Sequence, residues 1–205
     1  MEVLKPLPRR FYRPSAARVA PALLGHWLVR QTPDGLSGGR IVETEAYLHE
    51  DDPACHAAPG PTPRNRVMFG EPGHAYVYLI YGLHYCMNAV CLPPGTGEAV
   101  LVRAVDASLG TPLLHGRRKA KAIAHLTNGP AKLCEAMEID RSLDGVDLCD
   151  ANSPLFIANN LWVEDYRSEF GPTTTTRRIG ITKAAELPLR FYLERSPFVS
   201  VRPPR

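Results

Sequence analysis

The 205-residue sequence lacks the residue spacings that usually hold a metal ion. It contains no Cys-x-x-Cys pair and no His-Glu-x-x-His segment, and Cys55 and His56 have no metal-type partner pair nearby in the sequence. The number of cysteines is odd, and we expect free thiols in a reducing compartment, with no metal and no other cofactor. The five cysteines are Cys55, Cys86, Cys91, Cys134 and Cys149.

Long apolar runs are also missing. No stretch approaches the roughly 20 residues that a membrane-spanning helix needs, and the N-terminal "MEVLKPLPRRFYRPS" has no apolar run of the kind found in secretory signals. These absences predict a cytosolic protein with no membrane partner. Hydrophobic residues still make up 44% of the chain, enough for a core, and the 22% of charged residues argues against wholesale disorder.

Neither sign of charge dominates the composition. The 24 basic and 21 acidic residues leave a formal charge of +3, which by itself is too small to imply a nucleic-acid partner. The charges are nevertheless segregated, so one face can be basic on a nearly neutral protein. An acidic patch covers residues 50–52, and the basic groups are Arg64, Arg66, Arg117, Arg118, Lys119, Lys121, Arg177 and Arg178.

Turn residues divide the chain into short helices and strands. Strands are predicted at residues 26–32, 39–48, 74–82, 85–92 and 97–106. Helices are predicted at residues 16–25, where Ser15 can cap the first turn, and at residues 128–139. Residues 107–127 are expected to be irregular, residues 154–165 strand-like, and residues 171–183 a polar loop that leads into a strand.

These elements predict one α+β domain over residues 1–205, with a curved, mostly antiparallel sheet, short helices and long loops. Three prolines make residues 1–14 an expected extended segment. The loop over residues 49–74 contains five prolines and three glycines. Loops of this length in a compact domain usually carry function.

The predicted strand at residues 39–48 places acids on one face. Because side chains alternate along a strand, Glu43, Glu45 and Tyr47 share one side with Ile41. The other side includes Val42 and is predicted to face the core. On periodicity alone, an exposed face whose glutamates pair with arginines explains this pattern at least as well as a functional site.

The next strand favours a pocket. Residues 76–85 hold four of the eight tyrosines, among which Tyr76 and Tyr78 share a face and Tyr81 precedes a glycine. An aromatic sheet core and a stacking pocket for a flat ligand both fit this pattern. Asn88 and Arg103 follow within apolar strands, where each must find polar partners, and an arginine beside a carboxylate can hold it ionised.

Taken together, a carboxylate, stacking aromatic rings, a hydrogen-bonding Asn and Arg, and basic loops suit the hydrolysis of a nucleoside bond. A base inside a duplex is inaccessible, so an enzyme that acts on it must extrude it and stack it between rings. The departing base leaves an oxocarbenium-like sugar, and a carboxylate can activate water and stabilise that cation.

The sequence resembles the alkyladenine (3-methyladenine, methylpurine) DNA glycosylases. The resemblance lies in "RIVETEAYLHEDDPACHA", "TPRNRVMFGEPGHAYVYLIYGLHYCMN", "AVLVRAVD", "NGPAKLCEAM" and "LRFYLERSPFVSV", and it runs in order from about residue 16 to about residue 201. Alignment is loose only around residues 107–127 and 166–176. The family implies a monomer that acts on damaged purines in double-stranded DNA. The expected location is the cytoplasm of a bacterial-type cell, in association with the nucleoid.

The resemblance also implies roles for individual residues. Glu45 matches the general base, and Arg103 matches the arginine that holds the water and the acid. The matching base-pocket residues are Tyr47, His56, Tyr78 and Asn88, of which Asn88 lies at the floor. Tyr81 matches the residue that wedges into the duplex. Candidate phosphate contacts, for which solvated surface charge is an equal alternative, are Arg64, Arg66, Arg117, Arg118, Lys119 and Lys121.

No lysine lies within the motifs that carry Glu45 and Arg103, so a Schiff-base lyase step is unsupported and a monofunctional enzyme is expected. Three other functions stay open from the residues alone, of which a nucleoside or RNA hydrolase is the weakest. A lesion-binding protein without catalysis would need the same pocket. A carbohydrate hydrolase could use Glu43 and Glu45 as an acid/base pair, although the basic loops argue against it.

Overall fold

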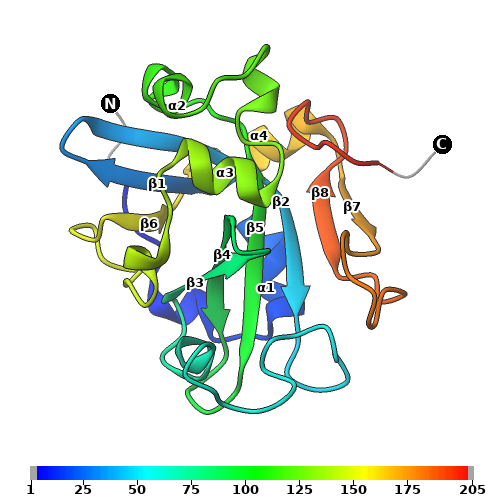
Figure 1. Cartoon of the computed structure of the whole chain (residues 1–205). Helices are drawn as coiled ribbons and strands as arrows, with labels where there is room; N and C mark the ends of the chain where they lie inside the picture. Colours follow the sequence, from blue (N-terminus) through cyan, green and yellow to red (C-terminus); the bar gives the residue numbers. More distant parts are fainter. Residues whose placement is uncertain (1–3, 203–205) are drawn as a thin grey trace.

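The structure is a computed structural model that describes residues 4–202. Its strands form one curled sheet in the order β3-β4-β5-β2-β1-β6, with β8 beside β2 and β7 beside β8 (Figure 1). All the pairings are antiparallel. The strands are β1 (Trp27–Thr32), β2 (Gly35–Tyr47), β3 (Ala75–Ile80), β4 (His84–Cys91), β5 (Glu98–Val105), β6 (Leu155–Ala158), β7 (Thr173–Thr176) and β8 (Arg190–Leu193).

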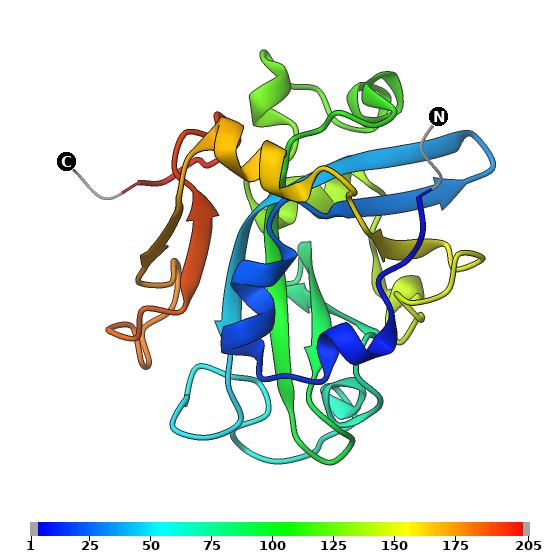
Figure 2. The same ribbon diagram turned by 180° about the vertical axis from the view of Figure 1, so that it is seen from behind.

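Four short α-helices accompany the sheet within the described residues. They are α1 (Ala16–Leu23), α2 (Thr111–Arg117), α3 (Pro130–Ala136) and α4 (Val163–Phe170). Helix α1 contacts β2 and β5 and covers them from behind in the view of Figure 1, as Figure 2 shows from the opposite side. Helix α3 contacts β4 and β5. The expected single α+β domain with a curved antiparallel sheet is therefore confirmed.

Strand β2 organises the molecule because it is long enough to pair with three neighbours. Its first half pairs with β1, and its second half lies between β5 and β8. Glu45 consequently stands opposite Leu101 on one side and Arg190 on the other. Asn88 of β4 pairs with Leu101 and with Tyr76 of β3. The acids of β2 and the tyrosines of β3 thus share one sheet.

The main core lies between α1 and the sheet, on the face of β2 predicted to be buried. Val42 and Ala46 belong to this core, and the buried Thr44 donates a hydrogen bond to the Ala20 carbonyl of α1 (2.9 Å). Ile41 also joins the main core, although alternation placed it with the acids, at a point where the register between β2 and β5 is irregular. A smaller cluster around Tyr76 forms a second apolar group beneath the predicted pocket.

Three local expectations are wrong. The stretch expected to be irregular, residues 107–127, contains α2, which starts after Gly110 (φ 59°) and buries Leu114. The strand expected at residues 154–165 ends at Ala158, because the Asn160 side chain accepts the backbone N–H of Trp162 (3.0 Å) and the chain turns into α4. In residues 171–183 the strand β7 precedes the loop instead of following it.

The N-terminal region also departs from expectation. The segment expected to be extended through residue 14 contains a turn of 3-10 helix at Arg9–Tyr12, and residues 1–3 lie outside the described part of the chain. Ser15 occupies the N-cap position of α1 but makes no side-chain capping bond. The Glu98 carboxylate accepts the free N–H of Ala16 instead (2.7 Å). Across residues 4–202, no helix has the length and apolar character needed to cross a membrane.

Candidate active site

Glu45 lies at the centre of a buried polar cluster. Arg103 Nη1 stands 3.2 Å from Glu45 Oε1, and the backbone N–H of Ile179 donates to the same oxygen (2.8 Å). The Tyr47 hydroxyl donates to Glu45 Oε2 (3.0 Å). Glu45 itself has no exposed surface. Three segments distant in the sequence, β2, β5 and the loop after β7, therefore fix one carboxylate.

Glu43 occupies the neighbouring position and is held by two arginines. Its Oε1 accepts Nε of Arg103 (2.9 Å) and Nε of Arg190 (2.6 Å), while Oε2 is buried and has no hydrogen-bond partner among residues 4–202. Burial disfavours the charged form of Arg103, but the carboxylates of Glu45 and Glu43 outweigh it and raise its pKa. Two acids and two arginines thus form a buried cluster whose formal charges balance.

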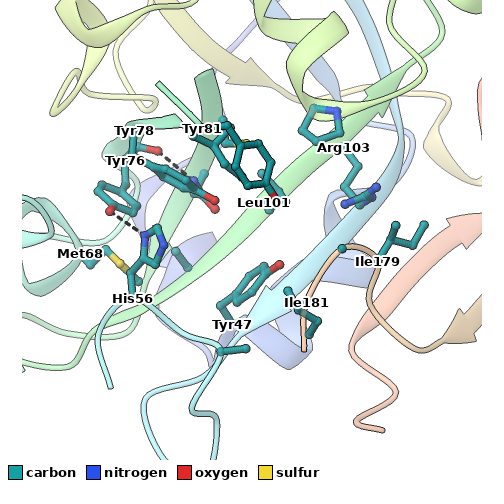
Figure 3. A pocket seen from close by; sticks show the side chains of 17 residues that line it. Tyr47, His56, Met68, Tyr76, Tyr78, Tyr81, Leu101, Arg103, Ile179 and Ile181 are labelled. Carbon is teal, nitrogen blue, oxygen red and sulfur yellow. Dashed lines mark hydrogen bonds between the residues drawn. The ribbon is translucent and has the colours of Figure 1, made fainter. Parts of the chain in front are cut away.

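A cavity of about 370 Å³ opens beside this cluster, a volume within the range of small-molecule sites. Figure 3 shows aromatic side chains around it, with Arg103 at one end. Glu45 does not line the cavity; it lies directly behind Tyr47, Arg103 and Ile179, which do. The cavity is lined by Tyr47, Ala54, His56, Met68, Tyr76, Tyr78, Ile80, Tyr81, Cys86, Asn88, Ala99, Leu101, Arg103, Pro130, Ile179, Gly180 and Ile181.

One wall of the cavity is a packed aromatic group. The rings of Tyr76 and Tyr78 stack at 5.3 Å with an interplanar angle of 30°, and the His56 ring meets Tyr78 edge-on at 4.4 Å. His56 Nδ1 and the Tyr76 hydroxyl form a hydrogen bond (2.9 Å). Burial, with a smaller effect of the nearby Arg64, lowers the pKa of His56, so the imidazole is neutral at neutral pH.

The loop that carries His56 is itself anchored. The Asn65 side chain donates to the carbonyls of His56 (2.7 Å) and Gly60 (3.0 Å). Asn88 lies on β4 at the cavity surface, and its amide nitrogen donates to the Tyr76 carbonyl (3.0 Å). The aromatic wall and the polar Asn88 are therefore fixed to the same pair of strands.

Tyr81 lines the cavity at its exposed rim. It lies in the turn between β3 and β4, where both Tyr81 (φ 53°) and Gly82 (φ 68°) adopt the left-handed conformation. Its side chain is 84% exposed, and that of Leu83 beside it is 73% exposed. A large aromatic side chain held out on a tight turn is available to contact a partner.

The six candidate phosphate contacts divide into two groups. Arg117 pairs with Glu138 (2.9 Å) and Arg118 with Glu135 (3.0 Å), so the structure commits both guanidinium groups to ion pairs. Arg64 is exposed at the cavity side, where its guanidinium lies 5.6 Å from the Tyr78 ring. The remaining exposed candidates are Arg66, Lys119 and Lys121.

The structure adds residues that the sequence reasoning missed. Arg190 reaches Glu43 from β8, and the rule that found Arg103, an arginine inside an apolar strand, would also have found it in "PLRFYL". Tyr76, which the sequence placed beside Tyr78 without assigning it a role, bonds His56 and lines the cavity. Arg178 and Asp52 form a fully buried ion pair (2.6 Å) behind the cavity wall. No local pattern in the sequence marks this pair, because its two members lie in separate loops.

Metal-binding groups and disulfides do not contribute to the described structure. Within residues 4–202, no cluster of three or more His, Cys, Asp or Glu side chains is arranged to hold a metal ion. All five cysteines carry free thiols, and only Cys149 is partly exposed. The polar side chains that line the cavity are Tyr47, His56, Tyr76, Tyr78, Tyr81, Cys86, Asn88 and Arg103.

The fold and the site together define a class of protein: an α+β domain whose cavity can hold a flat ring beside a buried carboxylate. Comparison with known families identifies it further. The family described as methylpurine-DNA glycosylase (MPG) matches residues 10–197. The chain belongs to the methylpurine-DNA glycosylase family. It is an enzyme that acts on DNA as a hydrolase of N-glycosyl bonds, and the resemblance noted in the sequence is confirmed.

Individual relatives agree over nearly their whole length. A protein of Methanocella arvoryzae is 47% identical over 206 residues, covering 97% of each chain. One of Methanoculleus marisnigri is 48% identical, covering 96% of this chain and 99% of the relative. One of Agrobacterium fabrum is 45% identical, covering 95% and 92%. Each of the three bears the name "Putative 3-methyladenine DNA glycosylase".

Proposed function

We propose that this enzyme removes methylated purines, 3-methyladenine among them, from double-stranded DNA, with Glu45 as the general base. The observation that carries the proposal is the position of Glu45. It contacts Tyr47, Arg103 and Ile179, which all line the aromatic cavity. A carboxylate at this position can act on a water molecule beside a ring that occupies the cavity.

The cavity suits an alkylated purine that has been turned out of the duplex. Methylation at N3 or N7 gives the purine a positive charge, and the electron-rich faces of Tyr47 and Tyr78 favour a cationic ring. Damaged bases also leave the helix at lower cost, which adds selectivity. Tyr81, exposed at the rim, would fill the space that the base vacates. Deaminated purines of similar shape are further candidate substrates.

The chemical step follows from the same positions. Water forms the new bond to the sugar C1′ while the bond from C1′ to the base nitrogen breaks, and the base takes the bonding electrons. Glu45 accepts the proton from water, and its carboxylate stabilises the positive charge that develops on the sugar. Arg103 holds Glu45 in place. Among the described residues that line the cavity there is no lysine, so we expect an abasic site as the product.

The other proposed roles follow the pocket. His56 and Tyr78 form the base wall, and Asn88 discriminates against the exocyclic amino group of guanine. Arg64, Arg66, Lys119 and Lys121 are the exposed candidates for phosphate contacts. We propose a monomer that works in the cytoplasm at the nucleoid. A carbohydrate hydrolase is less well supported, because the oxygen of Glu43 that accepts hydrogen bonds is shared by two buried arginines.

The experiment uses duplexes that each carry one defined lesion. After incubation with the protein, alkali-labile sites report base release. We expect cleavage of the duplexes with methylated purines, and we expect Glu45→Gln to abolish base release while binding of the damaged duplex survives. Undiminished base release by Glu45→Gln would refute the mechanism. A wild-type protein that binds the lesion but releases no base would favour the non-catalytic alternative.

A further inference from the structure

Behind the cavity wall lies an ion pair with no assigned role. Arg178 Nη1 stands 2.6 Å from Asp52 Oδ2, and Arg178 Nη2 stands 2.7 Å from Asp52 Oδ1, a two-point contact. Neither side chain has any exposed surface. Asp52 belongs to the loop after β2, and Arg178 to the loop after β7. The pair therefore joins two loops that lie far apart in the sequence.

Each residue of the pair also makes hydrogen bonds to the backbone around it. The Asp52 carboxylate accepts the backbone N–H groups of Leu48 (3.0 Å) and Ala54 (3.2 Å), which brackets the start of the loop that carries His56. Arg178 Nη1 donates to the carbonyl of Ala46 on β2 (3.0 Å). A buried pair of charges is expensive unless such extra bonds satisfy it. These bonds attach the pair to the strand that bears Glu45.

Two groups next to Arg178 donate hydrogen bonds to Glu45. The guanidinium lies over the Tyr47 ring, 4.6 Å from its centroid, and the Tyr47 hydroxyl donates to Glu45 Oε2 (3.0 Å). The next residue, Ile179, donates its backbone N–H to Glu45 Oε1 (2.8 Å). Arg178 is thus connected to a donor on each oxygen of the Glu45 carboxylate. It reaches the Tyr47 hydroxyl by stacking on the ring, and it reaches the Ile179 amide because the two residues are consecutive in the chain.

We propose that Asp52 and Arg178 are a positioning pair, which sets the Tyr47 hydroxyl and the Ile179 amide on Glu45 and so orients it for the reaction. The expected effect on the rate of base release rests on the proposed function, whereas the expected effect on hydrogen exchange of the Ile179 amide does not. Because a displacement of about 1 Å can cost on the order of 100-fold in rate, the pair matters to catalysis without touching the substrate.

The test compares two ion pairs that each contact strand β2, the first through the Ala46 carbonyl and the second through Arg40 itself. Arg178→Met leaves Asp52 buried without a partner, so Asp52→Asn/Arg178→Met is made alongside it to remove both charges and keep the fold. The control is Arg40→Met, with its own double variant Asp106→Asn/Arg40→Met. Arg40 pairs with Asp106 at 2.8 Å and lies 4.1 Å from the Tyr166 ring centroid, away from the cavity.

Two measurements are made on the full-length proteins. Hydrogen exchange of the Ile179 amide reports its bond to Glu45, and single-turnover base release at saturating enzyme reports the reaction, beside the affinity for a 3-methyladenine duplex. We expect the Asp52/Arg178 double variant to exchange Ile179 faster and to lose on the order of 100-fold in single-turnover rate, with affinity close to that of the wild type. We expect both Arg40 variants to match the wild type.

The outcomes separate the two proposals. Protected Ile179 exchange in the Asp52/Arg178 double variant, or a base-release rate equal to that of the Arg40 controls, would overturn the positioning role. A loss of affinity as large as the loss of rate would also overturn it, because the pair would then shape binding. A wild-type protein that releases no base would contradict the proposed function, while the exchange measurement would still decide whether the pair positions Glu45.

Discussion

Replacing Glu43 by glutamine separates the two acids of β2. The side chains of Glu43, Arg190 and Arg103 are 1%, 2% and 8% exposed, and one oxygen of Glu43 accepts both arginines. Glutamine keeps the shape but removes the charge, so the buried cluster changes from balanced to a net positive charge. Removing one partner of a buried pair costs about 3–5 kcal/mol, a large part of the roughly 5–15 kcal/mol that stabilises a typical domain.

Urea unfolding at pH 7 measures this cost. Glu164→Gln is the control, because Glu164 pairs with Arg167 at 2.9 Å while its side chain is 78% exposed, and such surface pairs contribute at most about 1 kcal/mol. Glu43→Gln/Arg190→Met restores the charge balance and should recover part of the loss. Equal stability losses for Glu43→Gln and Glu164→Gln would refute the reasoning. At a temperature where Glu43→Gln is folded, we expect it to release base when Glu45→Gln does not.

Two further predictions concern the rim and the core. Tyr81→Ala should weaken extrusion of the base by about 1–3 kcal/mol, the contribution of one stacked ring, and an unchanged fluorescence signal from a 2-aminopurine reporter would count against the wedge. Burial lowers the pKa of His26 from 6.5 to about 4, with a smaller contribution from the positive charge of Arg167. As the pH drops, the unfolded chain therefore binds the proton before the folded protein does, and the free energy of unfolding falls between about pH 6.5 and pH 4. The loss should reach about 3 kcal/mol, and unfolding of His26→Gln over this range should show a smaller one.

The sequence predicts those parts of the site that follow from a single strand. Alternation along β2 placed Glu43, Glu45 and Tyr47 on one face and gave the core face correctly. The cluster of tyrosines in and after β3 fitted both an aromatic core and a pocket, and the structure contains both, because Tyr76 is buried in the smaller apolar cluster and stacks on Tyr78 at the cavity. These patterns are local, because the backbone geometry of a strand fixes the direction of each side chain.

Contacts between distant segments could not be predicted in the same way. Alternation did not distinguish Glu43 from Glu45, whose surroundings differ because Arg103 of β5 reaches both acids while Arg190 of β8 reaches Glu43. Arg178 looks like any surface arginine in "TTTTRRIG", yet its side chain is fully buried. Helices α2 and α4 were also missed, although α1 and α3 are equally short and were predicted. At seven or eight residues, tertiary contacts can outweigh local preference.

The pairing of β8 with the middle of β2 has a consequence for folding during synthesis of the chain. Arg190 and Glu43 are 147 residues apart in the chain, and Ile179 and Glu45 are 134 apart. A nascent chain that ends before Arg178 already contains the aromatic residues of the cavity, yet it lacks one of the donors that hold Glu45. Contacts this remote form late and slowly. The carboxylate of Glu45 therefore gains its full set of hydrogen-bond donors only after the growing chain has passed Ile179.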